Sequence, residues 1–284
     1  MAGGLTAIVV GLVSGVLSGA FGIGGGLVTT PAIRLLLGYP ALIAVGTPLP
    51  VIVPGALTGA LSYHRRGLAD VRAGLTMGLV GSLGSIGGAL LSARAGGTVV
   101  LLATAVLILW ASTDMLLQDR RESSALRAAS PPATKGGRAA AGEAESDEAL
   151  ASAVGAARGR PTFQRLALIG LLAGVYSGFL GLGGGFVIVP ALTRFCGMPL
   201  KRAIGTSLVT VAVLAVPGTV AHSLLGHVDW TLAGLLAIGV VPGAFIGARF
   251  TERASDRTVR LLFAALLAVV GVWLAISEIP GLHL

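Results

Sequence analysis

The sequence predicts an all-α polytopic membrane protein with two inverted repeats, and three observations lead to this fold class. Hydrophobic residues make up 54% of the 284 residues and charged residues only 11%, whereas about a quarter of the residues are charged in an ordinary soluble protein. A glycine-rich pattern occurs twice, as SGAFGIGGGLVTTP at residues 18–31 and as SGFLGLGGGFVIVP at residues 177–190. Lys and Arg concentrate in connections that an inverted arrangement places on one side of the bilayer.

The similarity between the two halves extends far beyond the glycine-rich pattern. Residues separated by 159 positions, the distance from Gly24 to Gly183, match along most of the chain. The matched pairs include Gly46 and Thr47 with Gly205 and Thr206, Asp70 with Asp229, Gly88 with Gly247, and Arg94 with Arg253. A fixed period indicates duplication of one unit, so we expect a first membrane repeat at residues 1–117 and a second at 165–284, together forming one transport domain.

Each half contains about five hydrophobic segments, and the second segment of each half is short. The segments of the first half cover about 5–21, 27–37, 41–63, 72–93 and 98–117, and those of the second half about 165–180, 186–196, 203–225, 230–250 and 258–277. A helix of about 11 residues spans roughly 16 Å, half of a hydrocarbon core of about 30 Å. We therefore expect glycine-broken or re-entrant short helices at the centre, although ten tilted full spans fit the same pattern.

Prolines and aspartates suggest where these helices begin and bend. Pro31 and Pro190 are expected in the first turn of the two short helices, where the missing N–H costs little. The prolines of the two third segments predict bends there; they are Pro48, Pro50 and Pro54 in the first half and Pro217 in the second. Asp70 and Asp229 are candidate caps of the fourth helices.

Residues 118–164 differ abruptly from the hydrophobic halves. They are rich in Ala, Ser, Gly and Pro, carry mixed charge and contain almost no aromatic residues. Such a composition cannot bury enough apolar surface to fold alone. We interpret this stretch as a flexible linker between the repeats; a regulatory or partner-binding role is the less favoured reading.

The distribution of Lys and Arg predicts the orientation of the chain. With the N-terminus outside, the short cytoplasmic connections hold ten Lys or Arg residues and the external connections hold two, Arg34 and Arg94. The opposite parity of crossings would place more of these cations outside than inside, against the positive-inside rule. We therefore expect a multi-pass protein of the cell (inner) membrane with a cytoplasmic linker and both termini external.

The two GxGGG clusters are the candidate binding site for a small anion. Adjacent glycines permit positive φ and end a helix, so the next helix begins with backbone amides that lack partners within the helix. Such amides, together with the positive end of the helix dipole, attract anions. Small residues in membrane helices more often serve close packing, the reading we prefer for the four-residue spacing of Gly11, Gly15 and Gly19 and of their counterparts in the second half.

Hydroxyl groups near the two clusters are candidate additional donors to the anion. They belong to Ser18, Thr29, Thr30, Thr47, Ser177, Thr206 and Ser207. His64, His222 and His227 lie close to predicted segment ends, where we expect them at the membrane interface rather than at the substrate. No carboxylate occurs in a predicted span centre, so the sequence shows no obvious proton relay.

Several function classes fit the sequence poorly. The net charge of +8 arises from short connections and not from a basic stripe with interleaved aromatics, which argues against nucleic-acid binding. The chain has no HExxH motif and no nucleophile elbow, so we expect neither an enzyme nor a cofactor or metal. A transporter is favoured, with the lipid bilayer and a small anion as partners; the small-residue faces also allow a homodimer. An anion-selective channel lined by the same amides is the alternative.

The doubled pattern S-G-x-x-G-x-G-G-G-x-x-x-x-P and the downstream Gly-Thr pairs resemble the sulfite exporter TauE/SafE family of membrane anion permeases. The resemblance covers both repeats and excludes only the linker. It implies transport, generally outward, of a sulfur-containing anion such as sulfite or an organosulfonate, through a site where the two motif loops meet. By position, the implied site residues are Ser18, Gly22, Gly24, Gly25, Gly26 and Pro31, opposite Ser177, Gly181, Gly183, Gly184, Gly185 and Pro190.

Overall fold

The computed structural model describes residues 2–95, 99, 102–103, 105–115, 117 and 162–277, and this part of the chain forms helices without strands. The first half contains α1 (Ala2–Phe21), α2 (Gly26–Pro31), the π-helix η1 (Ala32–Leu36), α3 (Ala41–Gly46), α4 (Pro48–His64) and α5 (Val71–Ala95). The second half contains α8 (Phe163–Leu180), α9 (Gly185–Cys196), α10 (Leu200–Leu224), α11 (Trp230–Arg253) and α12 (Asp256–Ser277). Most of the predicted linker, residues 118–161, lies outside the described residues.

Six stretches of the described chain are long and apolar enough to cross a membrane. They are Gly4–Phe21, Ala41–His64, Val71–Ala95, Phe163–Leu180, Leu200–Leu224 and Trp230–Arg253. Shorter apolar helices lie at Gly26–Leu36, Ala105–Met115 and Gly185–Cys196. The predicted class, an all-α multi-pass membrane protein with short central helices, is confirmed.

The first helix of each half packs against the fourth helix of the other half, and we call these two pairs the exchanged helix pairs. α1 lies along α11, and α8 lies along α5. Three glycines on each first helix touch backbone carbonyls of the partner helix, so a Cβ atom has no room there. These contacts join Gly11, Gly15 and Gly19 to Leu236, Val240 and Ala244, and Gly170, Gly174 and Gly178 to Met77, Gly81 and Ser85. The packing role predicted for the four-residue glycine spacing is confirmed, and each contact has a counterpart 159 residues away.

Both short helices turn back along the helix that precedes them. The Ser14 hydroxyl lies 2.6 Å from the Thr29 hydroxyl, and Val10 of α1 packs in one cluster with Ile33 of η1.

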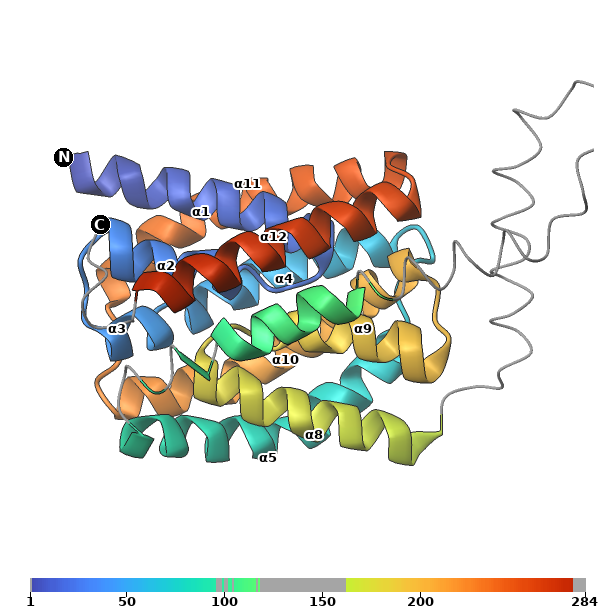
Figure 1. Ribbon diagram of the computed structural model, residues 1–284, viewed down its shortest axis with the longest axis horizontal. Helices are drawn as coiled ribbons and strands as arrows, with labels where there is room; N and C mark the ends of the chain where they lie inside the picture. The colour runs from blue at the N-terminus through green and yellow to red at the C-terminus, as the bar shows by residue number, and fades with distance from the viewer. Residues whose placement is uncertain are drawn as a thin grey trace, which may run out of the picture.

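In Figure 1, α1 begins and α12 ends at the left end of the bundle, whereas α8 begins at the right end and runs opposite to α1. α4 and α10 pack against each other within the bundle, between the two exchanged helix pairs.

Local signals explain most helix boundaries, and prolines explain the exceptions. The Asp70 carboxylate accepts a hydrogen bond from the Ala73 amide at 3.0 Å, and Asp229 accepts one from Leu232 at 2.9 Å. Both predicted caps are therefore confirmed. The expectation that prolines open the short helices is wrong, because Pro31 ends α2 and Pro190 lies inside α9. A proline at that depth removes a helical hydrogen bond, and in the first half the wider π-helix follows directly.

The third segment is interrupted in the first half and continuous in the second. There the chain divides into α3 and α4 around Thr47, directly before Pro48. α10 continues through Pro217 as one helix of 25 residues. Pro48 and Pro50, two positions apart, remove two amide donors from one turn, whereas Pro217 alone removes one from α10.

Candidate functional site

The two glycine clusters form equivalent loops with left-handed backbone conformations. The φ angles are 73°, 78° and 86° at Gly22, Gly24 and Gly25, and 66°, 76° and 72° at their counterparts Gly181, Gly183 and Gly184. L-residues with a side chain rarely adopt this region, so glycine is required to end one helix and start the next within four residues. The predicted helix breaks are confirmed in both halves. We call residues 22–26 the first loop and residues 181–185 the second loop.

The two loops lie directly against each other. A Cβ atom on Gly26 would be 2.7 Å from the Cα atom of Leu182, and a Cβ atom on Gly185 would be 2.7 Å from the Cα atom of Ile23. Each of these glycines also touches the carbonyl oxygen that opens the opposite loop, at Gly181 and Gly22 respectively. The backbones therefore touch without intervening side chains, and in this conformation they leave no space for an ion between these contacts.

Backbone amides at the start of both short helices have no acceptor within the described residues. α2 makes its first hydrogen bonds from the Val28 and Thr29 amides to the Gly25 carbonyl, and α9 does the same from Val187 and Ile188 to Gly184. The amides that precede them in each loop have no such bond to a described residue; they are those of Gly24, Gly25, Gly26, Gly183, Gly184 and Gly185. Such amides at a helix start favour negative charge.

Three predicted hydroxyls close to the loops are buried without a hydrogen-bond partner among the described residues. They belong to Ser18, Ser177 and Thr30, each with 0% exposure. Ser18 and Ser177 are repeat-related, and the side chain of each approaches the third glycine of its loop, Gly25 or Gly184. A buried hydroxyl without a partner costs about 1–3 kcal/mol. Two such groups in equivalent places are candidate donors to a bound ion or an ordered water.

Other predicted hydroxyls hold the first loop in place. The Thr29 hydroxyl donates to the Gly25 carbonyl at 2.9 Å, and Ser14 donates to the same oxygen at 2.6 Å. Ser207 of α10 donates to the Gly22 carbonyl. Ser14 was not among the predicted site residues, although its position four residues before Ser18 places both on one face of the helix.

Thr47 and Thr206 serve a different part of the fold. The Thr47 hydroxyl accepts a hydrogen bond from the Asp229 amide at 3.1 Å, and the Thr206 hydroxyl accepts one from the Asp70 amide at 2.9 Å. These two contacts are equivalent in the two halves and join the third segment of one half to the helix cap of the other. The structure thus places Thr47 at the turn before α11 and Thr206 at the turn before α5, where the oxygen of each hydroxyl accepts a hydrogen bond.

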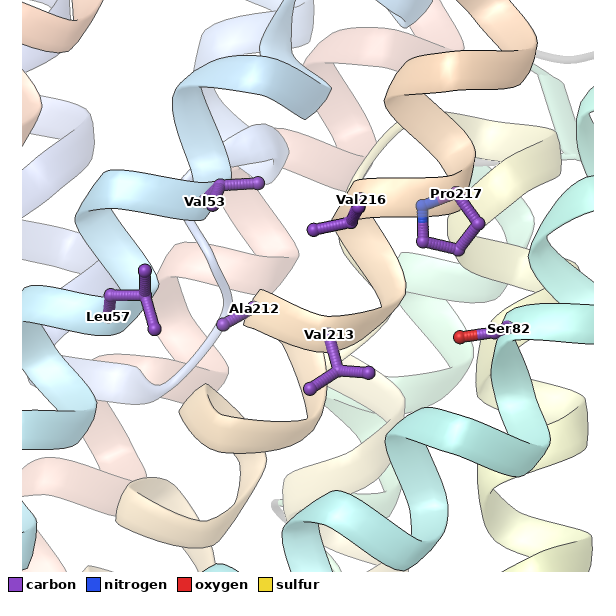
Figure 2. Close-up of a pocket in the computed structure, with 7 residues that line it drawn as sticks. All are labelled: Val53, Leu57, Ser82, Ala212, Val213, Val216 and Pro217. Atoms are coloured by element: carbon purple, nitrogen blue, oxygen red, sulfur yellow. The ribbon is translucent and has the colours of Figure 1, made fainter.

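Apolar side chains from α4 and α10 cover the loops. The Ile52 and Val211 side chains, which are repeat-related, both contact Gly24 and Gly183. The next residues along these helices, Val53 and Ala212, line a cavity of about 440 Å³ between α4 and α10 (Figure 2). Its other lining residues are Leu57, Ser82, Val213, Val216 and Pro217. The cavity is almost wholly apolar, so it is poorly suited to hold an anion.

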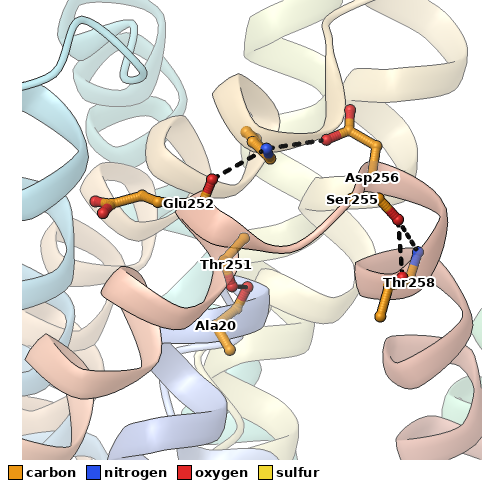
Figure 3. Close-up of polar contacts among 7 residues, drawn as sticks. Ala20, Thr251, Glu252, Ser255, Asp256 and Thr258 are labelled. Atoms are coloured by element: carbon orange, nitrogen blue, oxygen red, sulfur yellow. Dashed lines mark hydrogen bonds and ion pairs between the residues drawn. The ribbon is translucent and has the colours of Figure 1, made fainter. Parts of the chain in front are cut away.

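Ion pairs connect the helices at the end of the bundle where α8 begins. Glu252 at the end of α11 pairs with Arg66, and Asp70 pairs with Arg202 at 3.2 Å. Lys201 lies 3.7 Å from Asp256 and donates to the Glu252 carbonyl at 3.4 Å, in the turn between α11 and α12 that Figure 3 shows. No Lys or Arg is among the described residues nearest to the loop glycines, whereas the ion-paired cations named above lie at this end of the bundle.

A further equivalent pair, Tyr63 and His222, was missed as part of the site. The Tyr63 hydroxyl donates to the Gly19 carbonyl at 3.0 Å, and His222 Nε2 lies 2.9 Å from the Gly178 carbonyl. Both side chains have 0% exposure within the protein; His222 lies near the end of α10, and its place at the membrane interface stays a prediction. The 159-residue offset places the two residues at one position of the repeat, a signal that could have identified them.

Together, these features define a multi-pass all-α membrane protein whose two glycine loops meet in its interior. The chain belongs to the sulfite exporter TauE/SafE family, whose family model matches residues 7–274. It is therefore a membrane transporter of this type.

Several curated relatives match along nearly the whole chain. A probable membrane transporter protein of Bacillus subtilis, YunE, is 27% identical over 275 residues, which cover 93% of this chain and 94% of the relative. A probable membrane transporter protein of Xylella fastidiosa is 26% identical over 274 residues, covering 95% and 91%. The probable membrane transporter protein MJ0441 of Methanocaldococcus jannaschii is 21% identical over 291 residues, covering 94% and 93%. No solved structure gives a significant match.

Proposed function

We propose that this transporter exports a sulfur-containing anion, such as sulfite or an organosulfonate, and binds it between the two glycine loops near the middle of the membrane. The observation that carries this proposal is the equivalent pair of buried, unpartnered hydroxyls on Ser18 and Ser177. Each lies beside a loop whose leading amides also have no described acceptor. An oxyanion has several acceptor oxygens and no donors of its own, so it matches a site that offers only N–H and O–H groups.

The anion can enter this site only when the loops separate. In the present conformation the loops touch, and Ile52 and Val211 cover them. We propose that this is a closed state and that α4 and α10 move apart at the adjoining apolar cavity to expose the loops. Once the loops separate, the Ser18 and Ser177 hydroxyls and the loop amides would donate hydrogen bonds to the anion instead of to water.

Orientation and driving force follow from charge. We propose that the linker and the ion-paired end are cytoplasmic and that both termini are external, which places the two repeats in opposite orientations. The opposite directions of α1 and α8 in Figure 1 support this arrangement. An interior-negative potential of 100 mV favours outward movement of each negative charge by about 2.3 kcal/mol, so an electrogenic exporter needs no further energy source.

The substrate class is tested by counterflow in proteoliposomes. Vesicles loaded with one anion are diluted into labelled anion, using sulfite, sulfate, sulfoacetate, taurine and thiosulfate in turn. We expect transient accumulation of label with at least one sulfur oxyanion or sulfonate. Single-channel conductance without counterflow would establish the alternative, an anion-selective channel. Failure of the whole panel in both assays would refute the proposed substrate class.

The site is tested with Gly25→Val and Gly184→Val. Both glycines have positive φ and touch α1 or α8, so valine should distort the loops and abolish counterflow. Gly38→Val is the matched control, because Gly38 has a φ of 71° and no atom within 4 Å of its Cβ position. The control carries the same type of backbone strain outside the site. If all three variants insert and transport like wild type, the loops are not the binding site.

Orientation is tested by thiol labelling in a Cys196→Ala background, which removes the single cysteine of the chain. New cysteines replace the exposed His64, at the ion-paired end, and the partly exposed Tyr39, at the opposite end. We expect a membrane-impermeant reagent applied from outside to label the cysteine at position 39 but not that at position 64. The reverse pattern would overturn the proposed orientation.

A further inference from the structure

One position of the repeat performs the same structural task with two different side chains. Tyr63 lies near the C-terminal end of α4 and His222 near that of α10. The side chain of each contacts a carbonyl on the first helix of its own half. The turns that follow are also equivalent, since the Leu68 amide donates to the Tyr63 carbonyl and the His227 amide donates to the His222 carbonyl, both at 2.9 Å. The fold therefore needs a buried donor at this position, but the first half shows that it does not need an imidazole.

The second half places a second imidazole against the first. His227 Nδ1 lies 3.3 Å from His222 Nδ1, with the ring centres 5.4 Å apart. Because His222 Nε2 faces the Gly178 carbonyl, this nitrogen carries a hydrogen, and the tautomer follows from that contact. The short distance between the two Nδ1 atoms has room for one hydrogen only. The pair can therefore be neutral or take up one proton with its geometry intact, whereas a second proton would force the rings apart.

We propose that His222 and His227 form a proton-binding site and that its single proton strengthens anion binding at the second loop. The connection is direct, because His222 contacts the carbonyl of Gly178, the residue that follows Ser177. A positive charge at this place favours a nearby anion, and the equivalent Tyr63 cannot become cationic. This inference rests on the proposed function for the anion, whereas the uptake of a proton by the pair does not.

Among the described residues, no carboxylate hydrogen-bonds to either imidazole, and Asp229, two residues after His227, accepts instead from the Leu232 amide. The described contacts of the pair with its neighbours are to main chain: the His222 imidazole faces the Gly178 carbonyl, and Gly46 touches the His227 backbone. The titratable groups of described residues at this end include Asp229, Tyr39, the exposed Arg94 at the end of α5, and Arg34, whose guanidinium donates to the Tyr39 carbonyl at 3.3 Å. Burial lowers the pKa of His227, so an empty site takes up its proton at a lower pH than an exposed imidazole does.

Thermodynamic linkage between proton binding and anion binding determines how the anion affinity depends on pH. If one proton strengthens anion binding, the bound anion must raise the proton affinity of the pair by the same factor. Anion affinity should therefore be highest at low pH and decrease as the pH rises through the pKa of the pair. We expect a decrease of about tenfold between pH 5 and pH 8, a coupling in the usual range for linked sites.

The experiment measures ring titration and anion binding separately. Histidine-labelled protein is titrated by NMR in detergent, with and without sulfate or methanesulfonate, because neither anion titrates between about pH 5 and pH 8. Affinity for the same two anions is measured across that range. In wild type, we expect one proton to enter the pair and both anions to shift its titration to higher pH.

The decisive variant combines His222→Tyr with His227→Leu, which imports the residues that the first half uses at these positions. We expect it to fold, to bind the anions with the weaker, high-pH affinity and to lose the pH dependence. His222→Gln, which keeps an N–H donor toward Gly178, should do the same if tyrosine does not fit. His64→Gln, at the opposite end, is the matched control and should behave as wild type.

Three results would count against this inference. It is wrong if neither ring titrates between pH 5 and pH 8, about the range in which imidazole is expected to change charge. It is also wrong if folded variants keep the wild-type pH dependence of anion affinity. If neither anion binds at any pH, the anion site of the proposed function fails and the linkage with it. In that case the ring titration still decides whether the pair takes up one proton.

Discussion

Removing the unpartnered hydroxyls should make the protein more stable and less able to bind its anion. Ser18 and Ser177 each have 0% exposure and no hydrogen-bond partner among the described residues. A buried unpaired hydroxyl costs about 1–3 kcal/mol, whereas alanine keeps the Cβ atom and removes only the polar group. We therefore expect Ser18→Ala and Ser177→Ala to raise the free energy of unfolding by about 1 kcal/mol each, and by about 2 kcal/mol together.

Anion-dependent stability gives the functional half of this test. A ligand at 100 times its dissociation constant stabilises a protein by about 2.7 kcal/mol, so an effective sulfonate or oxyanion should raise the unfolding midpoint of wild type in detergent. Without the anion, the double variant should have a higher unfolding midpoint than wild type, and the anion should raise that midpoint little. Ser85→Ala is the control, since its buried hydroxyl donates to the Leu214 carbonyl at 3.2 Å, and its loss should cost about 1 kcal/mol. The reasoning fails if the double variant loses as much stability as this control, or keeps the full gain from the anion.

Two further predictions concern the scaffold. Gly174→Leu should prevent correct packing of α8 on α5, because its Cβ atom would overlap the Gly81 carbonyl; Gly87→Ala, with open space at its Cβ position, should be neutral or stabilising by up to about 1 kcal/mol. Gel filtration of the purified variants distinguishes the two, and normal yield of the leucine variant would contradict the packing role. Asp229→Ala should lower the free energy of unfolding by about 1 kcal/mol through loss of the cap on the Leu232 amide, and an unchanged denaturation midpoint would show that the cap contributes nothing.

The sequence predicted the elements of the fold well, because membrane helices depend on simple local signals. Uninterrupted apolar stretches predicted the long helices, and consecutive glycines predicted the breaks before α2 and α9. Asp70 and Asp229 capped the helices they precede, since their carboxylates are short enough to reach the backbone three residues later. The glycines of α1 and α8 were recognised as packing residues because their spacing of four places them on one helix face.

The partners of the candidate site residues could not be predicted in the same way. Spacing along the chain indicated that Thr47 and Thr206 lie near the loops, but not that their hydroxyl oxygens accept hydrogen bonds from the Asp229 and Asp70 amides. Nor could it show that the loops touch, since that contact joins residues about 160 positions apart. Whether a hydroxyl is free or engaged depends on such tertiary contacts, which local pattern does not specify.

The unequal hydrogen bonding of the two loops suggests which one opens first. Three side-chain hydroxyls hold carbonyls of the first loop, from Ser14, Thr29 and Ser207. The equivalent positions of the second loop hold Ala173, Ile188 and Pro48, none of which has a side-chain donor. Ser14 and Thr29 also lie 2.6 Å from each other, so one of the two can donate to the other instead of to Gly25. At about 1 kcal/mol for each hydrogen bond, the carbonyls of the second loop are held less firmly by roughly 2–3 kcal/mol. Opening should therefore begin at the second loop, beside Ser177. The proposed proton site lies next to this loop, so the proton would bind beside the half of the anion site that opens first.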